Sequence, residues 1–328
     1  MTSTGAALAG LLLPPIGSHW AIIMSQTTSI EWCDSTFNPW IGCTRISPAC
    51  DDCYAARSTP ARALDVAWGP KEERRRTSPA NWALPRRWNA NAAEFQAEHG
   101  RRRRVFCASL ADVFDNQVPQ EWRDDLWRLI SETPQLDWLL LTKRVGNVTS
   151  MLPVSSDFAD LFPHVWIGAT ICNQDEADRD IPKLQAVPAR VRFLSMEPLL
   201  GPVDLLATGD VLCRCSGCLS MASLYPESAG LQRIDWVIVG GESGPRARPM
   251  SPTWVRHIRD QCLSARVPFL YKQWGEWVPT EALLEGFSIR PDKQTTLEGW
   301  TMVRAGKKAA GRHLDRVEHN GFPCVSTT

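Results

Sequence analysis

The feature that most constrains the fold is a repeated unit, in which a short apolar run ends in polar residues and is followed by a helical pattern. The runs are almost continuously apolar, which is typical of strands covered on both faces in a parallel sheet. They are FNPWIGC (37–43), RVFCASLADVF (104–114), DWLLLTKR (137–144), VWIGATI (165–171), RVRFLSMEPLL (190–200), DWVIVGGESG (235–244) and PFLYKQW (268–274).

Helical patterns separate these runs at 119–133, 172–188 and 251–265. The last of them begins with Ser251 as the expected N-cap and with Pro252 at the first helical position. Strands that alternate with helices form βα units with right-handed crossovers. The glycine-rich turn of a dinucleotide-binding fold does not follow the first strand. We therefore predict an α/β protein in which six to seven βα units form a full or partial (β/α) barrel.

Breaks in this repeat predict how the 328-residue chain is organised. Patterned sequence begins at the second methionine, so we expect residues 1–23 to be a dispensable extension and residues 24–276 to form the barrel. The cysteine-rich segment 207–233 resembles a small insertion between the fifth and sixth units. Residues 277–328 are mostly polar and are expected to pack on the barrel as a C-terminal extension.

Charge and hydropathy narrow the classes of function. The 36 Lys and Arg residues balance 36 Asp and Glu residues, so no global field draws the protein to nucleic acid or to an anionic membrane. No apolar run reaches the roughly 18 residues of a membrane helix, and the N-terminal run lacks the basic flank of an export signal. We expect a cytoplasmic protein with no membrane partner. Its clustered cysteines, kept reduced there, indicate metal or redox chemistry.

Polar side chains follow every predicted strand. The carboxyl ends of the strands surround the catalytic cavity of a barrel. One polar residue at such a position is commonly a helix cap, but the same placement in successive units indicates a shared cavity. We expect this cavity to be lined by Tyr54, Ser109, Asp112, Lys143, Arg144, Thr170, Glu197, Gly240, Gly241, Glu242, Ser243, Lys272 and Gln273.

The charged members of this set allow two interpretations. Glu197 and Glu242 could bind an ammonium group or a ribose. Lys143, Arg144 and Lys272 could bind a carboxylate or a phosphate through charge-assisted hydrogen bonds. A structural alternative is an ion pair between Lys143 and Glu197 across the mouth of the barrel, because such pairs imitate binding sites.

Three cysteines, Cys43, Cys50 and Cys53, form a C-x6-C-x2-C array directly after the first predicted strand. Thiolates select zinc, copper(I) or iron–sulfur clusters. A structural zinc site needs four ligands, and Cys33 could supply the fourth. A 4Fe–4S cluster held by three cysteines instead keeps one iron open to another ligand. The position at the catalytic end of a strand favours the cluster, because a structural zinc site has no reason to lie there.

Three close cysteines after the first strand of a (β/α) barrel resemble the radical S-adenosylmethionine (SAM) superfamily. Residues 28–323 are similar, more specifically, to the radical-SAM-like phage gene-product thirty-seven/sixty-eight family. The similar segments are SIEWCDSTFNPWIGCTRISPACDDCYA, RVFCASLADVFD, LLLTKR, RFLSMEPLLGP, DWVIVGGESGPRARPM and PFLYKQWGEW.

The resemblance implies a 4Fe–4S cluster on Cys43, Cys50 and Cys53, with SAM bound at the open iron. It also implies reductive cleavage of SAM to a 5′-deoxyadenosyl radical and an electron donor such as flavodoxin or ferredoxin. The commonest spacing in that superfamily is C-x3-C-x2-C, whereas the first gap here is six residues. Its Gly-Gly-Glu motif for the SAM amino group follows the second strand. Because residues 240–242 follow the sixth unit, that role is not transferred to them.

A second cysteine group, Cys213, Cys215 and Cys218, lies within the predicted insertion. Three cysteines within six residues are rare by chance and favour zinc or an auxiliary iron–sulfur cluster over free thiols. Cys262 or another thiol could complete the ligand set of a zinc site. The spacing does not distinguish zinc from iron.

The arginines at 74–76 and 101–104, with Trp82 and Trp88 between them, indicate either a nucleic-acid contact or a solvated basic connection. The sequence thus predicts a radical-SAM-type enzyme with an unknown substrate, for which a nucleic-acid base, in modification or repair, is the preferred class. The alternative is a non-catalytic zinc-binding phage protein that binds DNA or a protein partner.

Overall fold

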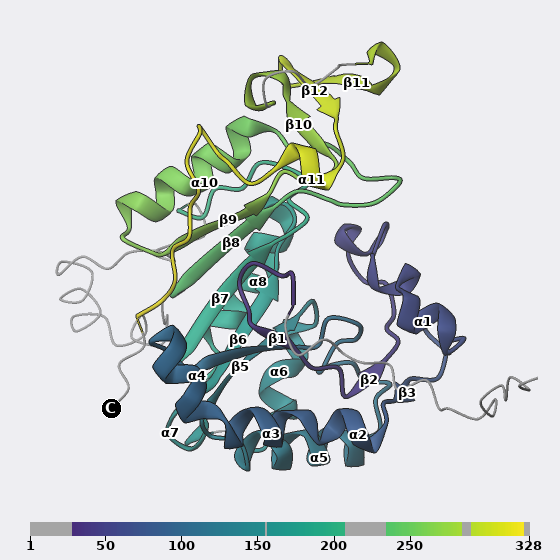
Figure 1. Cartoon of the computed structure of the whole chain (residues 1–328), viewed down its shortest axis with the longest axis vertical. Coiled ribbons are helices and arrows are strands. Elements are labelled where there is room, and N and C mark those ends of the chain that lie inside the picture. The colour runs from purple at the N-terminus through teal and green to yellow at the C-terminus, as the bar shows by residue number, and fades with distance from the viewer. Residues whose placement is uncertain (1–27, 155, 207–233, 284–289, 325–328) are drawn as a thin grey trace, which may run out of the picture.

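Seven parallel strands form one sheet, in the order β1, β4, β5, β6, β7, β8, β9 (Figure 1). The structure is a computed structural model and describes residues 28–154, 156–206, 234–283 and 290–324. Within these residues β1 and β9 do not pair, so the sheet is a partial barrel, and the predicted α/β fold class is confirmed. The strands are β1 Ser35–Thr36, β4 Arg103–Cys107, β5 Leu136–Thr142, β6 Val165–Thr170, β7 Val191–Met196, β8 Trp236–Gly240 and β9 Phe269–Gln273, and a separate antiparallel pair is β2 Trp40–Ile41 with β3 Arg75–Arg76.

Helices follow β4, β6 and β8 as predicted, namely α5 Gln120–Ser131, α8 Gln174–Gln185 and α10 Pro252–Ser264. The side chain of Ser251 caps α10 by accepting a hydrogen bond from Thr253 N. The other described helices are α1 Thr59–Ala63, α2 Pro79–Trp82, α3 Leu84–Ala90, α4 Ala92–His99, α6 Val145–Met151, α7 Phe158–Leu161 and α11 Lys307–Ala310, with the 3-10 helices η1 Pro48–Cys50, η2 Ala55–Arg57, η3 Thr280–Ala282 and η4 Pro291–Lys293. In the described ranges, none of the helices has the length and apolarity to cross a bilayer.

Each face of the sheet has its own core. On the outer face, strand residues such as Leu140 and Val237 pack with residues of α5, α8 and α10. The inner face carries an aromatic cluster, which Trp32 joins from the segment before β1; its rings belong to Trp32, Phe106, Trp166, Phe193 and Trp236.

This inner aromatic cluster determines where polar groups can lie. Strand side chains alternate between faces, so Thr170 and Ser195 share the inner face with Trp166 and Phe193 but lie nearer the carboxyl ends. On β6, Gly168 lies between Trp166 and Thr170 and has no side chain. A Cβ at this position would lie 2.3 Å from Phe193 Cζ. The aromatic rings therefore fill the half-barrel toward the amino ends of the strands, and polar side chains occupy the rim at the carboxyl ends.

The first predicted strand, 37–43, is wrong in its bounds, and the strand within it does not belong to the parallel sheet. The sheet is joined by β1, which ends before this stretch, whereas β2 within it pairs with β3 outside the sheet. Pro39 interrupts the run, because proline has no N–H for a ladder hydrogen bond. The side chain of Asn38 instead accepts a hydrogen bond from Leu110 N at 2.7 Å. Cys43 consequently follows β2, close to the end of β4.

The C-terminal part contains a small antiparallel sheet that the sequence did not predict, formed by β10 Trp277–Pro279, β11 Gln294–Leu297 and β12 Trp300–Arg304. The chain then returns along the edge strand β9. Gly321 N donates to Phe269 O at 2.9 Å, and Trp236 Nε1 donates to Gly321 O at 2.8 Å. This return covers the exposed edge of the parallel sheet.

Candidate functional site

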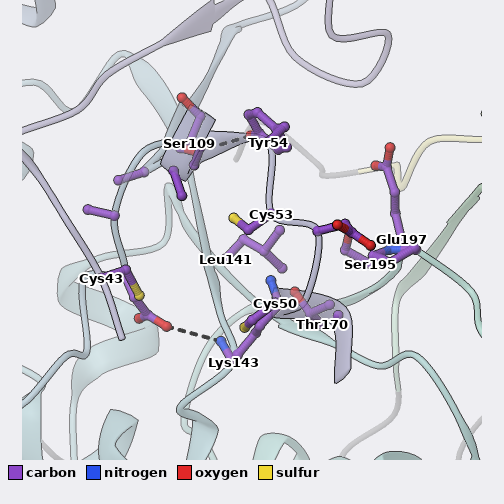
Figure 2. A pocket seen from close by; sticks show the side chains of 18 of the residues that line it. Cys43, Cys50, Cys53, Tyr54, Ser109, Leu141, Lys143, Thr170, Ser195 and Glu197 are labelled. Atoms are coloured by element: carbon purple, nitrogen blue, oxygen red, sulfur yellow. Dashed lines mark hydrogen bonds between the residues drawn. The ribbon is translucent and has the colours of Figure 1, made fainter. Parts of the chain in front are cut away.

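A cavity of about 800 Å³ lies at the carboxyl ends of the parallel strands, beside the segment that carries Cys43, Cys50 and Cys53 (Figure 2). This volume is typical of small-molecule sites. We call the segment 43–57 the cysteine loop. Apart from Gly240, the predicted set lines the cavity, namely Cys43, Cys50, Cys53, Tyr54, Ser109, Asp112, Lys143, Arg144, Thr170, Glu197, Gly241, Glu242, Ser243, Lys272 and Gln273.

Cys43, the first cysteine of the array, is held by Arg144, which lies two residues after β5. Arg144 Nη1 donates to Cys43 Sγ at 3.3 Å, and Arg144 Nη2 donates to the carbonyl of Thr44 at 2.8 Å. Asp112 accepts from Arg144 Nη1 at 3.1 Å. Burial alone would lower the pKa of Arg144, but Asp112 and Cys43 raise it above its ordinary value. Burial, reinforced by Asp112, raises the pKa of the Cys43 thiol to about 11.

Beyond Cys43 the cysteine loop crosses the ends of several strands. Ser47 and Ala49 lie beside the sulfur of Cys172, two residues after β6, and Arg248, after β8, donates to Asp51 Oδ2 at 3.2 Å. Three strand spacings from β5 to β8 amount to roughly 14 Å. With the common spacing of three residues between the first two cysteines, the loop would cover roughly that distance only if it were fully extended. The six-residue gap of this array therefore lets the loop bridge the mouth of the half-barrel.

The three thiols of the array are free and line the same cavity, as Figure 2 shows. Across the described ranges, no three His, Cys, Asp or Glu side chains are grouped so that they could hold one metal ion. A tetrahedral zinc ion requires that convergence. Each cysteine of a cubane cluster binds a different iron atom, so its thiols stand farther apart. Cys43, Cys50 and Cys53 are the donors that such a cluster would use.

Cys33, which could have been the fourth ligand, does not line the cavity. Its side chain is 8% exposed and packs in the inner aromatic cluster beside Trp32. Burial, reinforced by the charge of Asp34, raises the pKa of this thiol far above its ordinary value. The placement of Cys33 assigns it to packing and argues against a four-cysteine zinc site.

The predicted ion pair at the mouth exists with a different lysine. Lys272 Nζ, not Lys143, binds the carboxylate of Glu197, at 2.6 and 2.8 Å. Glu242 is likewise occupied, because Arg248 donates to both of its oxygens. Among the described cations that line the cavity, Lys143 is the one whose charged group has no carboxylate partner, although its backbone N donates to Asp112 Oδ2 at 3.1 Å. The structure thus leaves one cation for an anionic ligand.

Four buried polar atoms of the cavity wall have no hydrogen-bond partner among the described residues: Thr170 Oγ1, Gln273 Oε1, Trp32 Nε1 and Trp68 Nε1. The first three belong to residues that are 3%, 4% and 2% exposed. Buried polar atoms are nearly always paired, because an unpaired one costs about 1–3 kcal/mol. These atoms are suited to hydrogen bonds with a bound molecule. Trp32 was not predicted as a site residue, since its sequence position precedes every strand.

A family described as "Protein of unknown function (DUF5131)" matches residues 27–323. The chain belongs to the DUF5131 family. The match does not confirm the more specific phage family that the sequence motifs resemble. A search of curated proteins found no match.

Two solved structures are similar to this DUF5131 protein. One is a spore photoproduct lyase complexed with dinucleoside spore photoproduct, at 12% identity. The other is a mutant of spore photoproduct lyase with bound AdoMet and dinucleoside spore photoproduct, at 11% identity. In both comparisons the TM-score is 0.35, and the alignment covers 83% of this chain and 68% of the other.

The Gly-Gly-Glu segment of this DUF5131 protein serves packing. A Cβ on Gly241 would lie 1.9 Å from the carbonyl oxygen of Trp274, so only glycine allows this approach of β8 and β9. Glu242, which follows, is 6% exposed and pairs with Arg248. The arginines at 246 and 248 that anchor the cysteine loop were not singled out from the sequence. The Gly-Gly-Glu sequence alone does not reveal that Glu242 pairs with Arg248.

Two predictions concern residues outside the described part of the chain. The extension 1–23 and the insertion 207–233, with Cys213, Cys215 and Cys218, lie there. Cys262, considered as a further ligand of that group, is described and fully buried in the outer core. Burial raises the pKa of its thiol to about 12.

The basic segments are largely engaged within the fold. Arg74 is buried and pairs with Asp115 at 2.8 Å. Arg76 pairs with Asp125 at 2.7 Å and stacks over Trp82 at 4.3 Å. The arginines at 101–104 likewise pair with Asp34 and Asp137 or stack over Phe95 and Phe322. These contacts favour a structural role for the two segments over a free cationic surface.

Proposed function

We propose that this protein is a radical-SAM-type iron–sulfur enzyme in which Cys43, Cys50 and Cys53 hold a 4Fe–4S cluster. The observation that carries the proposal is the placement of three free thiols around one cavity at the carboxyl ends of a parallel half-barrel. When bound, such a cluster supplies the electron that cleaves SAM to a 5′-deoxyadenosyl radical. A flavodoxin or a ferredoxin would deliver this electron.

The remaining groups of the cavity suit the binding of SAM. Lys143 would bind the methionine carboxylate, because Arg144 and Lys272 already pair with carboxylates of the protein. Thr170 Oγ1 and Gln273 Oε1 would bind polar atoms of the cofactor or the substrate, which satisfies their missing hydrogen bonds. Cys43 keeps its place through Arg144, whose positive charge opposes the rise in the pKa of this thiol that burial and Asp112 cause.

The proposed substrate is a nucleic-acid base. Tyr54, more than half exposed, and Trp68 line the cavity on the side of the cysteine loop. Aromatic rings at such a mouth can stack on a base, which contributes about 1–3 kcal/mol per base. The paired arginines at 74–76 and 101–104 add little to this proposal, so the support comes from the cavity itself.

The test is anaerobic reconstitution with iron and sulfide, followed by reduction with dithionite in the presence of SAM. We expect about four iron and four sulfide per chain if the array holds one cubane. We also expect 5′-deoxyadenosine to form, with more turnover in the presence of a DNA or RNA substrate. A colourless protein that retains stoichiometric zinc instead would support the alternative of a non-catalytic zinc protein.

A further inference from the structure

Beyond Cys43, the cysteine loop is attached to the sheet through Arg248 and through Tyr54, whose Oη donates to the carbonyl of Ser109 at 3.1 Å. The backbone N and Nε of Arg248 both donate to Glu242 Oε2 at 2.8 Å, and its Nη2 donates to Glu242 Oε1 at 2.6 Å. The same guanidinium reaches the cysteine loop. Nη1 donates to Asp51 Oδ2 at 3.2 Å, and Nη2 donates to the carbonyl of Pro48 at 3.0 Å.

The chemistry of this link depends on the shape of the arginine side chain. A guanidinium is planar and presents several N–H donors in fixed directions, whereas a lysine ammonium is a single point of charge. Its hydrogen bond to Glu242 raises the pKa of Arg248 above its ordinary value, so the group stays charged. Glu242 is buried just after β8 and holds the guanidinium of Arg248 in a fixed position.

A neighbouring contact supports the same half of the loop from outside. Asp52 Oδ1 accepts from Arg57 Nη2 and from Arg246 Nε, both at 2.6 Å. The Arg246 side chain is 70% exposed, and exposed ion pairs contribute little. Arg248 is therefore the main attachment on this side, while Arg144 attaches the loop at Cys43 on the other.

We infer that Arg248 is a positioning residue, which rests on Glu242 and fixes the Cys50–Cys53 half of the cysteine loop over the cavity. Without it, the half of the loop beyond Cys43 would keep the hydrogen bond from Tyr54 Oη to the carbonyl of Ser109, at 3.1 Å, and exposed pairs. The second and third thiols would then lose their fixed distance from the first. The effect on loop order is independent of the proposed function, and only the effect on iron binding rests on it.

The test compares R248A, R248K and E242Q with a matched control, R45A. Arg45 also pairs with Asp51, at 2.6 Å, but it is 69% exposed and belongs to the loop itself. Hydrogen–deuterium exchange of residues 47–57 and alkylation of Cys50 and Cys53 by iodoacetamide are measured in metal-free protein. Iron per chain is measured after reconstitution.

In R248A we expect exchange and alkylation to become about tenfold faster or more, as the loss of a charge-assisted hydrogen bond implies. R248K and E242Q should lie between R248A and wild type, and R45A should match wild type. If R248A does not fold, R248K and E242Q decide the question. Unchanged exchange in these variants, or an equal effect of R45A, overturns the inference. Faster exchange combined with no iron in the wild-type protein would support the positioning role and contradict the proposed function.

Discussion

Glu197 reaches Lys272 across the space left by Gly240. The two charged groups lie at the ends of β7 and β9, with β8 between them. Lys272 Nζ nevertheless donates to both carboxylate oxygens of Glu197, at 2.6 and 2.8 Å. A Cβ on Gly240 would lie 3.3 Å from Cγ and Cδ of Glu197. The glycine thus makes room for an ion pair that ties three strands together at the rim of the cavity.

Replacing Lys272 with methionine should destabilise the protein by about 2 kcal/mol, because the mostly buried Glu197 carboxylate loses its cation. The double variant E197Q/K272M should be more stable than the sum of the single effects predicts. Urea denaturation measures these differences. As a control, K183M removes a lysine that is 45% exposed from its pair with Asp180 and should cost under about 1 kcal/mol. Equal effects of K272M and K183M would contradict this prediction.

Alanine at any one of Cys43, Cys50 or Cys53 should abolish both the cluster and the reductive cleavage of SAM, since three thiolates are the minimum set. C33A should keep iron and activity, and lose only the packing of one buried sulfur, about 1 kcal/mol. Iron and sulfide analysis, visible absorption and 5′-deoxyadenosine formation provide the readouts. Loss of iron in C33A would show that the ligand set has four members.

The variant K143Q should bind SAM about tenfold or more weakly and keep its iron content, because a charge-assisted hydrogen bond to a carboxylate contributes about 1.5–3 kcal/mol. Equilibrium binding of SAM to the reconstituted protein measures the effect. Lys307 offers a matched control. It also lines the cavity, but its Nζ already lies 4.0 Å from Glu31 Oε1 and so has a carboxylate of the protein beside it. K307Q should bind SAM nearly as wild type does, and an equal loss in both variants would rule out a specific role for Lys143.

His164 should make stability fall below pH 6.5. Burial lowers the pKa of this histidine from the ordinary value of 6.5, and its Nε2 lies 3.1 Å from Ile130 O. The unfolded chain therefore takes up a proton that the folded chain refuses, so stability is lost as pH falls through the unfolded pKa, by at most about 1.4 kcal/mol per pH unit. Denaturation of wild type and H164Q between pH 7.5 and 5.5 should give a flatter profile for H164Q. Parallel profiles would contradict the prediction.

Much of the fold could be predicted because continuous apolar runs are a strong signal for buried parallel strands. All runs after the first contain a strand, and the caps of α10 were correctly assigned to Ser251 and Pro252. The first run failed because Pro39 breaks a ladder without changing the apolar pattern. The helices at 79–99 were missed because this segment has no clear apolar stripe.

The position of the site could also be predicted, since strand ends in a parallel sheet meet at one edge. Which side chains pair with one another within the site could not be predicted. Lys143 and Lys272 look alike in the sequence, and only the strand order shows that Glu197 meets Lys272 across a glycine. The same holds for Arg248, whose partners Glu242 and Asp51 precede it by 6 and by 197 residues.

Gly241 gives the sharpest test of how closely β8 and β9 approach. Its N donates to Gln273 O at 2.9 Å, and a Cβ would lie 1.9 Å from Trp274 O, which is backbone and cannot turn aside. G241A should therefore cost about 3 kcal/mol or more. G146A provides the control, because Gly146 lies in α6 with its nearest neighbour at 3.8 Å, and alanine there should stabilise by about 0.5–1 kcal/mol. The two variants should shift the urea midpoint in opposite directions, and a G241A midpoint equal to that of wild type would mean that the strands are farther apart than described.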